Sequence, residues 1–292
     1  MKMAGMKWGL NYELAIEMDP GTSEAIIIRP PLTLTFNIVR NTLHGVNTAT
    51  ISVYNLKEST RRIVYHDRIN TDTKTYRRIV LRAGYGNDMP IVFRGNIREA
   101  SSARQGVNYI TEIEAFDGGD AVINGFTVQT WPAGTNIRAI MTDIVKNMPN
   151  VVLGKIGDFS GTSYRGTTVV GNSWEMLVRI SGDQAQPFID NEKVNVLGVN
   201  EVIGNGFRIL DASTGLLDTP KRQDTVLEIK TLLEPHLEIG QVVELRSMES
   251  LYNGRYKVCG LVHSGTISEA VGSVCTTEAS LYLGTAALKE VA

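Results

Sequence analysis

A long pattern of alternating hydrophobic and polar residues runs through positions 32–56 of this sequence. Apolar residues such as Leu34 and Phe36 occupy every second position, and the alternation resumes after a segment of Asn, His and Gly. A period of two puts one set of side chains on a buried face and the other in water, which is the pattern of a β-strand. We therefore predict two long amphipathic strands joined by a loop, with no catalytic group in either.

Short strand patterns separated by turn residues fill the rest of the first 120 positions. We predict them at residues 8–17, 26–28, 78–83, 91–97 and 107–116. Residues 58–65 instead have helical spacing and are predicted to form one or two helical turns. Closely spaced strands with turn clusters between them indicate an all-β barrel or sandwich.

The period of the pattern changes after Phe126. Apolar residues recur at helical spacing over residues 137–145, and Thr135 is the expected N-cap of this helix. A second helix is predicted after Asn172, where Glu175 completes the spacing of a capping box. Residues 188–197 read as a hairpin, so the middle of the chain is expected to be a small α+β unit.

Strand patterns return after a loop-like segment at residues 211–220. They lie at residues 225–232, 241–246, 255–263 and 276–283. The first three-strand run (residues 78–116) and this last one share the order strand, turn, strand with a central Gly, strand, which suggests an internal repeat. We predict a mainly β protein with an α+β insert, divided into domains at residues 1–125, 126–215 and 216–292.

Composition excludes several classes of protein. The formal net charge is −2, which argues against a protein that binds nucleic acid through an overall positive charge. No apolar run approaches the length of about 20 residues that a membrane span needs, and the start of the chain lacks the features of a signal peptide. Two cysteines do not make a disulfide framework, so a cytosolic origin is expected.

Candidate metal ligands are few. Cys259, His263 and Cys275 offer three groups of the kind that bind zinc, but a structural zinc site needs four, usually in paired motifs. We therefore expect Cys259 to pack within a strand and His263 to end it. Gly204 and Gly206 flank Asn205 in a way that resembles a phosphate loop, yet a strand follows, so a hairpin turn is favoured.

Catalytic motifs are not found in the sequence. Glu112 and Glu114 alternate on one strand face, which a solvated or interface role explains, and the basic pairs Arg61-Arg62 and Arg77-Arg78 fit the same explanation. The sequence contains no nucleophile elbow, HExxH or P-loop motif. We predict a protein that is not an enzyme and binds no cofactor or metal.

Several segments together resemble the baseplate hub proteins of phage tails. The N-terminal part of the resemblance runs through ISVYNL, ESTRRI, LRAGYG, IVFRGNI and ITEIEAFDGG. The middle carries NSWEMLVRI, and the C-terminal part runs through LLEPHLEIGQVVELRS and YNGRYKVCGLVHSG. The likeness spans most of the chain and consists of strand patterns and turn residues rather than an active-site signature.

This resemblance implies two tail-tube-like β-barrel domains around the α+β domain. It also implies a homotrimer whose six similar barrels join the six-fold tail tube to the three-fold central spike and form part of the DNA channel. The expected partners are the tail tube protein, the central spike protein and other baseplate proteins, with DNA only in passage and no membrane insertion. The expected location is the virion tail baseplate, after assembly in the host bacterial cytoplasm, with no cell-wall activity.

The polar face of the first strand pair is our candidate assembly surface, because it is free to line a bore or meet a neighbouring subunit. Its residues are Thr33, Thr35, Asn37, Thr48, Thr50 and Ser52. Two alternatives remain open at this point: a β-barrel module that binds glycan or single-stranded nucleic acid, and a hydrolase with an acid pair that the sequence does not reveal.

Overall fold

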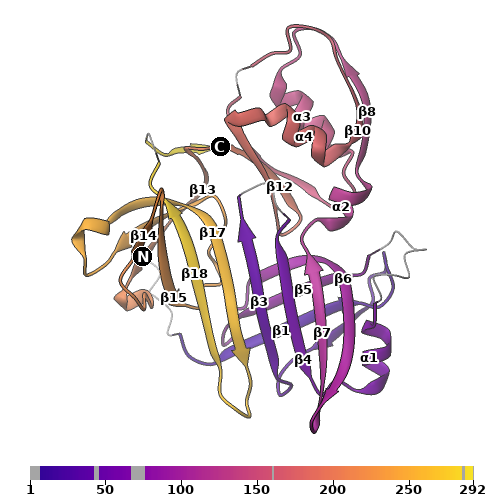
Figure 1. The fold of residues 1–292 in the computed structure, drawn as a ribbon, viewed down its shortest axis with the longest axis vertical. Coiled ribbons are helices and arrows are strands. Elements are labelled where there is room, and N and C mark those ends of the chain that lie inside the picture. The colour runs from indigo at the N-terminus through magenta and orange to yellow at the C-terminus, as the bar shows by residue number, and fades with distance from the viewer. Residues whose placement is uncertain (1–6, 43–45, 67–75, 160, 285–286, 292) are drawn as a thin grey trace.

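The computed structural model describes residues 7–42, 46–66, 76–159, 161–284 and 287–291, and these form a mainly β protein with a few short helices (Figure 1). The strands are β1 Leu10–Glu17, β2 Ala25–Ile28, β3 Leu34–Asn41, β4 Thr48–Tyr54, β5 Arg78–Tyr85, β6 Ile91–Gln105, β7 Asn108–Phe116, β8 Phe126–Trp131, β9 Val152–Ile156, β10 Thr167–Asn172, β11 Ala185–Asp190, β12 Lys193–Gly198, β13 Glu201–Asp211, β14 Lys221–Gln223, β15 Val226–Leu232, β16 Gln241–Arg246, β17 Gly254–Ile267, β18 Val274–Tyr282 and β19 Lys289–Val291. The helices are α1 Glu58–Val64, α2 Gly119–Asn124, α3 Ile137–Lys146 and α4 Ser173–Ser181, with 3₁₀ turns η1 Gly182–Gln184, η2 Ala212–Thr214 and η3 Ser250–Tyr252.

The predicted strand pair is present at the centre of the main sheet. β3 and β4 pair antiparallel, with Phe36 opposite Ile51, and their buried positions alternate as the sequence predicts. Leu32 and Thr33 lie just before β3 rather than in it. Positions 43–45 of the predicted loop lie outside the described residues.

The predicted mainly β fold with an α+β insert is confirmed, but its two predicted β-barrels are not closed barrels among the described residues. Pairing instead follows one open path of a 14-stranded sheet, β14-β15-β18-β17-β3-β4-β7-β6-β5-β1-β2, with β13, β16 and β19 as a branch. The reason is that β17 pairs with β3 from Gly260↔Asn41 to Ile267↔Leu34, so the two β parts join edge to edge. Figure 1 shows the resulting front layer, with β1 crossing behind β3 and β4.

The internal repeat appears as two antiparallel meanders, β5-β6-β7 and β16-β17-β18. The central strand of each is long, at 15 and 14 residues, and each carries a register shift against the strand that follows. The sequence pattern missed the second half of β6, because residues 98–105 are mostly polar and exposed and show no alternation. Pairing with β7 rather than burial holds that half in place.

The middle of the chain has the predicted α+β character. The helix N-caps are Asn136, which accepts a hydrogen bond from the N–H of Arg138 at 2.8 Å, and Asn172, which accepts one from the N–H of Glu175 at 3.1 Å. Thr135 is therefore not the cap of α3. The predicted hairpin is confirmed as β11 and β12, which are joined by Asn191 and Glu192, both at positive φ.

Three buried apolar clusters fill the molecule. The first cluster lies among β1–β7, the second lies in the α+β region, and the third lies among β13 and β15–β18. The clusters cross the sequence boundaries, since Leu233 and Ile267 pack in the first cluster and Phe188 and Leu197 in the last. The three regions therefore depend on one another for burial.

A buried ion pair fastens the β11–β12 hairpin to the main sheet. The guanidinium of Arg40, at the end of β3, donates to both carboxylate oxygens of Asp190 at 2.8 and 2.6 Å. Asp117 accepts the N–H groups of Asn191 and Glu192 at 2.5 and 2.8 Å, and Asn47 donates to the carbonyl of Ile189 at 2.7 Å. Burial and the charge of Asp190 raise the pKa of Asp117 to about 8.

His263 on β17 lies on the other side of Arg40. Its Nε2 is 3.5 Å from Nη1 of Arg40, and its Nδ1 is 2.9 Å from the hydroxyl of Thr277. Because a guanidinium can only donate, Nε2 is the acceptor and the ring is neutral. Burial, followed by the charge of Arg40, lowers the pKa of His263 to about 3.

Arg40→Met should destabilise the protein strongly. It leaves the Asp190 carboxylate, in a residue that is 8% exposed, without a cation, and breaking a buried pair in this way costs about 3–5 kcal/mol. Arg62→Met is the matched control, because its ion pair with Glu58 is exposed and worth roughly 0–1 kcal/mol. Urea unfolding of both variants measures the difference, and equal losses would show that Arg40 is not the fastening group.

His263→Gln should change how stability depends on pH. A histidine whose pKa is lowered by folding contributes stability that is fully present above about pH 6.5 and is lost as the pH falls toward 3, because only the unfolded chain gains the proton. The free energy of unfolding of the wild type minus that of the variant should fall by about 1.4 kcal/mol per pH unit between pH 6 and 4. A difference that stays constant with pH would contradict this prediction.

Candidate assembly surface

The register of the sheet brings most of the predicted polar residues onto one face. Thr35 lies opposite Ser52, Asn37 opposite Thr50, and Thr48 lies farther along β4 on the same side. Side chains directly across an antiparallel pair share a face, so these five residues form one continuous surface. Thr33 adjoins it from outside the strand, with its hydroxyl 2.7 Å from that of Ser268.

The face continues beyond the strand pair in both directions. On the β17 side, Thr266 lies opposite Thr35 and their hydroxyls are 3.0 Å apart, while Ser264 lies opposite Asn37 and Thr276. The sequence reading of this surface missed Ser264 and Thr266, because they lie more than 200 positions from β3. The alternation of Ser264 and Thr266 with buried residues is visible in the sequence, but the pairing of β17 with β3 is not.

On the other side the face becomes acidic. Glu112 lies opposite Ser52 and Glu114 opposite Thr50, and β6 adds Ser101 and Glu99 across from these two glutamates. Glu99 and Glu114 are exposed and lie directly opposite each other, so their two carboxylates repel each other. No Lys or Arg occurs among the paired positions that run from Ser264 and Thr266 on β17 to Glu99 and Ser101 on β6. Beyond them, Lys257 of β17 lies opposite Tyr282 on the same side of the sheet.

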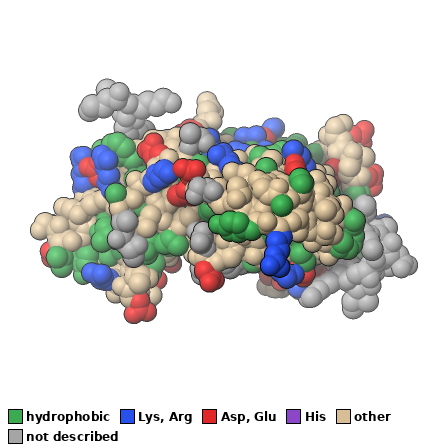
Figure 2. All heavy atoms as spheres, turned by 90° about the horizontal axis from the view of Figure 1, so that it is seen from above, with side chains coloured by type: hydrophobic (Ala, Val, Ile, Leu, Met, Phe, Trp, Pro, Cys, Tyr) green, Lys and Arg blue, Asp and Glu red, His purple; other side chains and the backbone are tan. Residues whose placement is uncertain are grey.

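The visible surface elsewhere does not show this bias. Seen from above, basic and acidic side chains are interspersed with hydrophobic ones, and neither charge dominates the view (Figure 2). The absence of cations from the paired positions between Ser264 and Glu99 is thus a local feature of a chain whose formal net charge is only −2.

The candidate metal ligands serve other contacts. The thiol of Cys259 lies 3.1 Å from the carbonyl of Ser280, and that of Cys275 lies 3.6 Å from the carbonyl of Thr266. His263 contacts Arg40 and is buried within β17 rather than at its end. In the part of the chain that the structure describes, no three His, Cys, Asp or Glu residues are grouped so as to hold a metal ion.

The Gly-Asn-Gly segment is not a hairpin turn. Gly204 and Gly206 both lie inside β13, where the register against β16 shifts between Ile203 and Phe207. Gly206 has φ +76°, a conformation that glycine adopts without strain. The segment is therefore a bulge within one strand, which local sequence cannot distinguish from a turn because both need the same residues.

The basic pairs are occupied by contacts within the protein. The guanidinium of Arg61 lies 3.8 Å from the ring centroid of Tyr109, and Arg62 pairs with Glu58. Arg77 donates to the carbonyl of Ile63, and Arg78 pairs with Glu192.

None of the described helices is long and apolar enough to cross a membrane.

The sequence matches the family described as baseplate hub gp41 over residues 13–264. The chain belongs to this family. It is therefore a structural component of a phage tail baseplate and not an enzyme. A comparison with curated proteins finds no match to the sequence.

Solved structures share the fold at low sequence identity. The 43 kDa tail protein of prophage MuSo2 from Shewanella oneidensis has a TM-score of 0.61 and 8% identity, over 92% of this chain and 96% of that one. A tail protein from Neisseria meningitidis MC58 has a TM-score of 0.56 and 11% identity, over 94% and 97% of the two chains. The E. coli c3393 protein, a type VI secretion component similar to T4 tail proteins gp27 and gp5, has a TM-score of 0.59 and 8% identity, over 92% and 76%.

Glu114→Gln should stabilise the protein slightly. It removes the repulsion with Glu99 across the β6–β7 pair, which is worth a few tenths of a kcal/mol for exposed charges at low salt. Glu112→Gln is the matched control, since Glu112 lies opposite Ser52 and Ser101 and loses no repulsion across the strands. Urea unfolding at low and at 1 M salt measures the effect, which the added salt should remove. A gain that persists in high salt would mean that repulsion is not its cause.

Proposed function

We propose that this protein is the hub itself: a homotrimeric ring that joins the hexameric tail tube to the trimeric central spike and encloses a section of the DNA channel. The single observation that carries the proposal is that one chain holds two similar meanders in one sheet, joined by the strand pair β3–β4, which pairs with β17 on one side and with β7 on the other. Three such chains present six similar units to a six-fold partner and three whole chains to a three-fold one. The protein is then a symmetry adaptor that acts by its geometry.

The continuous polar face is the proposed wall of the channel. Its Thr, Ser and Asn side chains are wetted without being charged, and the charges that it does carry at Glu99, Glu112 and Glu114 are negative. A basic wall would hold DNA by neutralising its phosphates and releasing counterions. A wall whose central positions, from Ser264 to Glu99, carry no cation lets the duplex pass, and this advantage offsets the repulsion between Glu99 and Glu114.

The proposed organisation keeps three domains at residues 1–125, 126–215 and 216–292. The three apolar clusters follow this division only in part, because Leu233 and Ile267 pack in the first cluster, and β13 from the middle segment pairs with β16 and β19 of the last. The proposed partners are the tube protein, the spike protein and other baseplate proteins. Assembly in the host bacterial cytoplasm before incorporation into the virion is part of the same proposal.

The ring is tested by measuring mass in solution and by imaging single particles, alone and with the spike protein. We expect a species of three times 32.0 kDa and ring-shaped particles with three-fold symmetry. A protein that stays monomeric at every concentration and forms no ring with the spike protein would contradict the proposal.

Reversing the charge of the polar face should make the channel hold DNA. The triple variant Glu99→Lys, Glu112→Lys and Glu114→Lys places cations along it, and the affinity of the assembled protein for duplex DNA should rise roughly tenfold or more at low salt. The gain should fall steeply as salt is added.

The control for this experiment carries the same change in net charge elsewhere. Glu24, Asp183 and Glu290 are exposed and lie off the polar face, so their replacement by Lys should raise DNA affinity much less. Fluorescence anisotropy with a labelled duplex compares the two triple variants, and equal affinities would show that the face does not line the channel.

A further inference from the structure

The internal repeat is longer than the two meanders. A strand pair precedes each meander in the chain: β3 and β4 come before β5-β6-β7, and β14 and β15 come before β16-β17-β18. In the sheet, β4 pairs with β7 and β15 pairs with β18. The two repeats therefore have matching strand orders, β3-β4-β7-β6-β5 and β14-β15-β18-β17-β16.

The two repeats also correspond at the level of single residues. Their central strands each skip one residue against the strand that follows, between Ile97 and Glu99 in β6 and between Val258 and Gly260 in β17. When these two shifts are superposed, residues 101–103 of β6 correspond to residues 262–264 of β17. The second half of β6 is thus the counterpart of the second half of β17.

The first strands of the two repeats, β3 and β14, correspond in the same way. Residues that lie opposite each other can be followed across each repeat from its first strand to its central strand. They lead from Asn37 to Glu99 in one repeat and from Lys221 to Gly260 in the other, in each case to the first paired residue after the shift. Lys221–Gln223, which make up β14, therefore correspond to residues 37–39 of β3.

Within the chain, the first strand of one repeat pairs with the central strand of the other. β3 lies along the second half of β17, with Asn37 opposite Ser264 and Val39 opposite Val262. The equivalent contact joins β14 to residues 101–103 of β6, and a single chain does not make it. Figure 1 shows β14 and β6 on opposite sides of the front layer. The chain thus makes this contact once and carries the two halves of a second one at its two sides.

Both halves of this second contact are open. β14 pairs with β15 on one side, and no described strand pairs with it on the other. The first half of β6 pairs with β5, and Ala100 is bridged to His66, but no described strand pairs with residues 101–105 on that side. Lys221–Gln223 and residues 101–105 are all exposed, so another chain can reach both edges.

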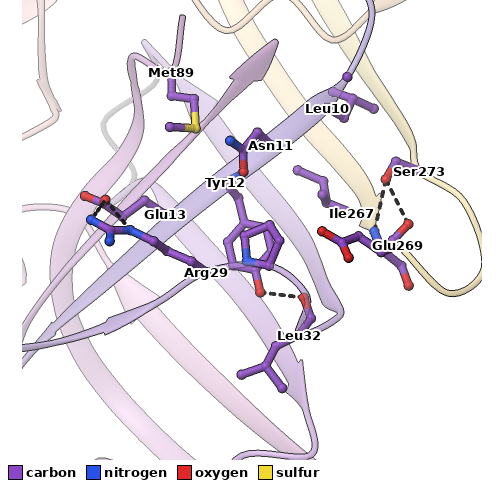
Figure 3. Close-up of a pocket in the computed structure, with 13 residues that line it drawn as sticks. Leu10, Asn11, Tyr12, Glu13, Arg29, Leu32, Met89, Ile267, Glu269 and Ser273 are labelled. Carbon is purple, nitrogen blue, oxygen red and sulfur yellow. Dashed lines mark hydrogen bonds and ion pairs between the residues drawn. The ribbon is translucent and has the colours of Figure 1, made fainter. Parts of the chain in front are cut away.

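The unpaired edge at the start of β1 does not offer the same access. Tyr12 is only 1% exposed, and its hydroxyl donates to the carbonyl of Leu32 at 2.6 Å. Figure 3 shows Tyr12 directed at Leu32, in the connector that precedes β3. The protein's own residues therefore cover this edge, whereas solvent covers the edges of β14 and β6.

We propose that β14 of one copy of this chain pairs antiparallel with the second half of β6 of the next copy, with Arg222 opposite Ser102. The β3–β17 pairing sets the register, because it places the corresponding residues Ile38 and His263 opposite each other. The occupant of both edges is a second copy, since β14 is the one described strand that corresponds to β3. The contact is head-to-tail, the kind that closes into a ring, and in this respect the inference rests on the proposed function.

The side chains at the proposed contact suit an edge that lies in water before assembly. In the β3–β17 pairing, Ile38 and His263 are both buried completely. Their counterparts Arg222 and Ser102 are polar and exposed. A single copy therefore exposes no apolar side chain at either position, and the pairing between copies depends on backbone hydrogen bonds.

Charge favours pairing between copies over the blocking of an edge. A short edge strand that carries lysine often prevents association, and β14 carries Lys221 and Arg222. However, the strands at the other edge carry Glu99, Glu112 and Glu114 on the side of the sheet where Lys221 also lies. The proposed contact brings the basic strand of one copy to the acidic side of its neighbour, where the opposite charges attract.

The test is a disulfide between copies. The double variant Ser102→Cys, Arg222→Cys carries one new thiol at each edge, and directly opposite residues have Cα atoms about 4.5–5.5 Å apart, which a disulfide spans. The protein is oxidised mildly, alone and with the spike protein. A head-to-tail ring should give a closed covalent trimer of three times 32.0 kDa on a non-reducing gel.

Three controls connect the disulfide to this contact. Each single variant carries only one half of the pair and should not form a link, which also accounts for the native thiols of Cys259 and Cys275. A mixture of the two single variants should give covalent dimers, because the contact lies between copies. Arg222→Cys combined with Met248→Cys, at a fully exposed position, should form no trimer.

A pair of charge variants tests the register without any cysteine. In the proposed register Ala103 lies opposite Lys221, so Ala103→Lys should raise the protein concentration needed for assembly roughly threefold or more, and Ala103→Glu should lower it. The same two substitutions at Val107, which is 88% exposed and lies beyond the contact, should change it much less. Sedimentation measures assembly, and circular dichroism checks that each variant is folded.

The outcomes separate this inference from the ring. A trimer in solution that the double variant does not link would overturn the contact and leave the ring. Links in either single variant would also overturn it, because they require a self-complementary contact. A ladder of linked chains that never closes at three would keep the contact and remove the trimeric ring. A protein that neither links nor assembles would overturn both.

Discussion

The pairing of β3 with β17 is the constraint on which the rest of the structure depends. It joins strands that are more than 200 positions apart in the chain and turns two separate meanders into one sheet. Without this pairing, β3 and β17 would both have an unpaired edge, and a long unpaired edge favours association with other chains. With it, the polar sides of β17, β18, β3 and β4 become one surface, and the apolar sides share burial across the joint.

The same joint explains why a buried charge is tolerated at its end. Arg40 is the last inward-facing residue of β3, where the sheet meets the β11–β12 hairpin, and it contacts Asp190 and His263. A buried ion pair often adds little net stability, but arrangements that leave one of its charges buried and unpaired have a much higher free energy. The ion pair therefore fixes where the α+β region sits relative to the sheet, which apolar contacts alone specify less strictly.

The two sides of the sheet have different chemistry. The proposed channel side presents hydroxyls, amides and carboxylates, and it accepts the repulsion between Glu99 and Glu114. The other side holds the apolar core, in which the buried side chains of β1 pack in one cluster with those of β3 and β4. One sheet thus separates a solvated surface from the apolar core.

Much of this organisation was predictable from local patterns. The alternation in residues 34–54, the helical spacing before Lys146 and the hairpin at Asp190 each depend on side chains close in sequence, and the structure confirms all three elements. The capping residue of α3 was misplaced by one position, since Thr135 and Asn136 are both good caps and only backbone geometry selects between them. The second half of β6 was missed because neighbouring strands hold it without burying it.

The sequence by itself determined which side chains lie on the polar face of β3 and β4, because a period of two assigns each residue to one side of a strand. Only the tertiary structure decided which strands lie beside that pair. Edge pairing uses backbone groups that every residue has, so the sequence does not reveal that β17 rather than another strand joins β3, or that Ser264 and Thr266 extend the face. Nor does it reveal that two barrels become one open sheet, since closure depends on which edges find partners at long range.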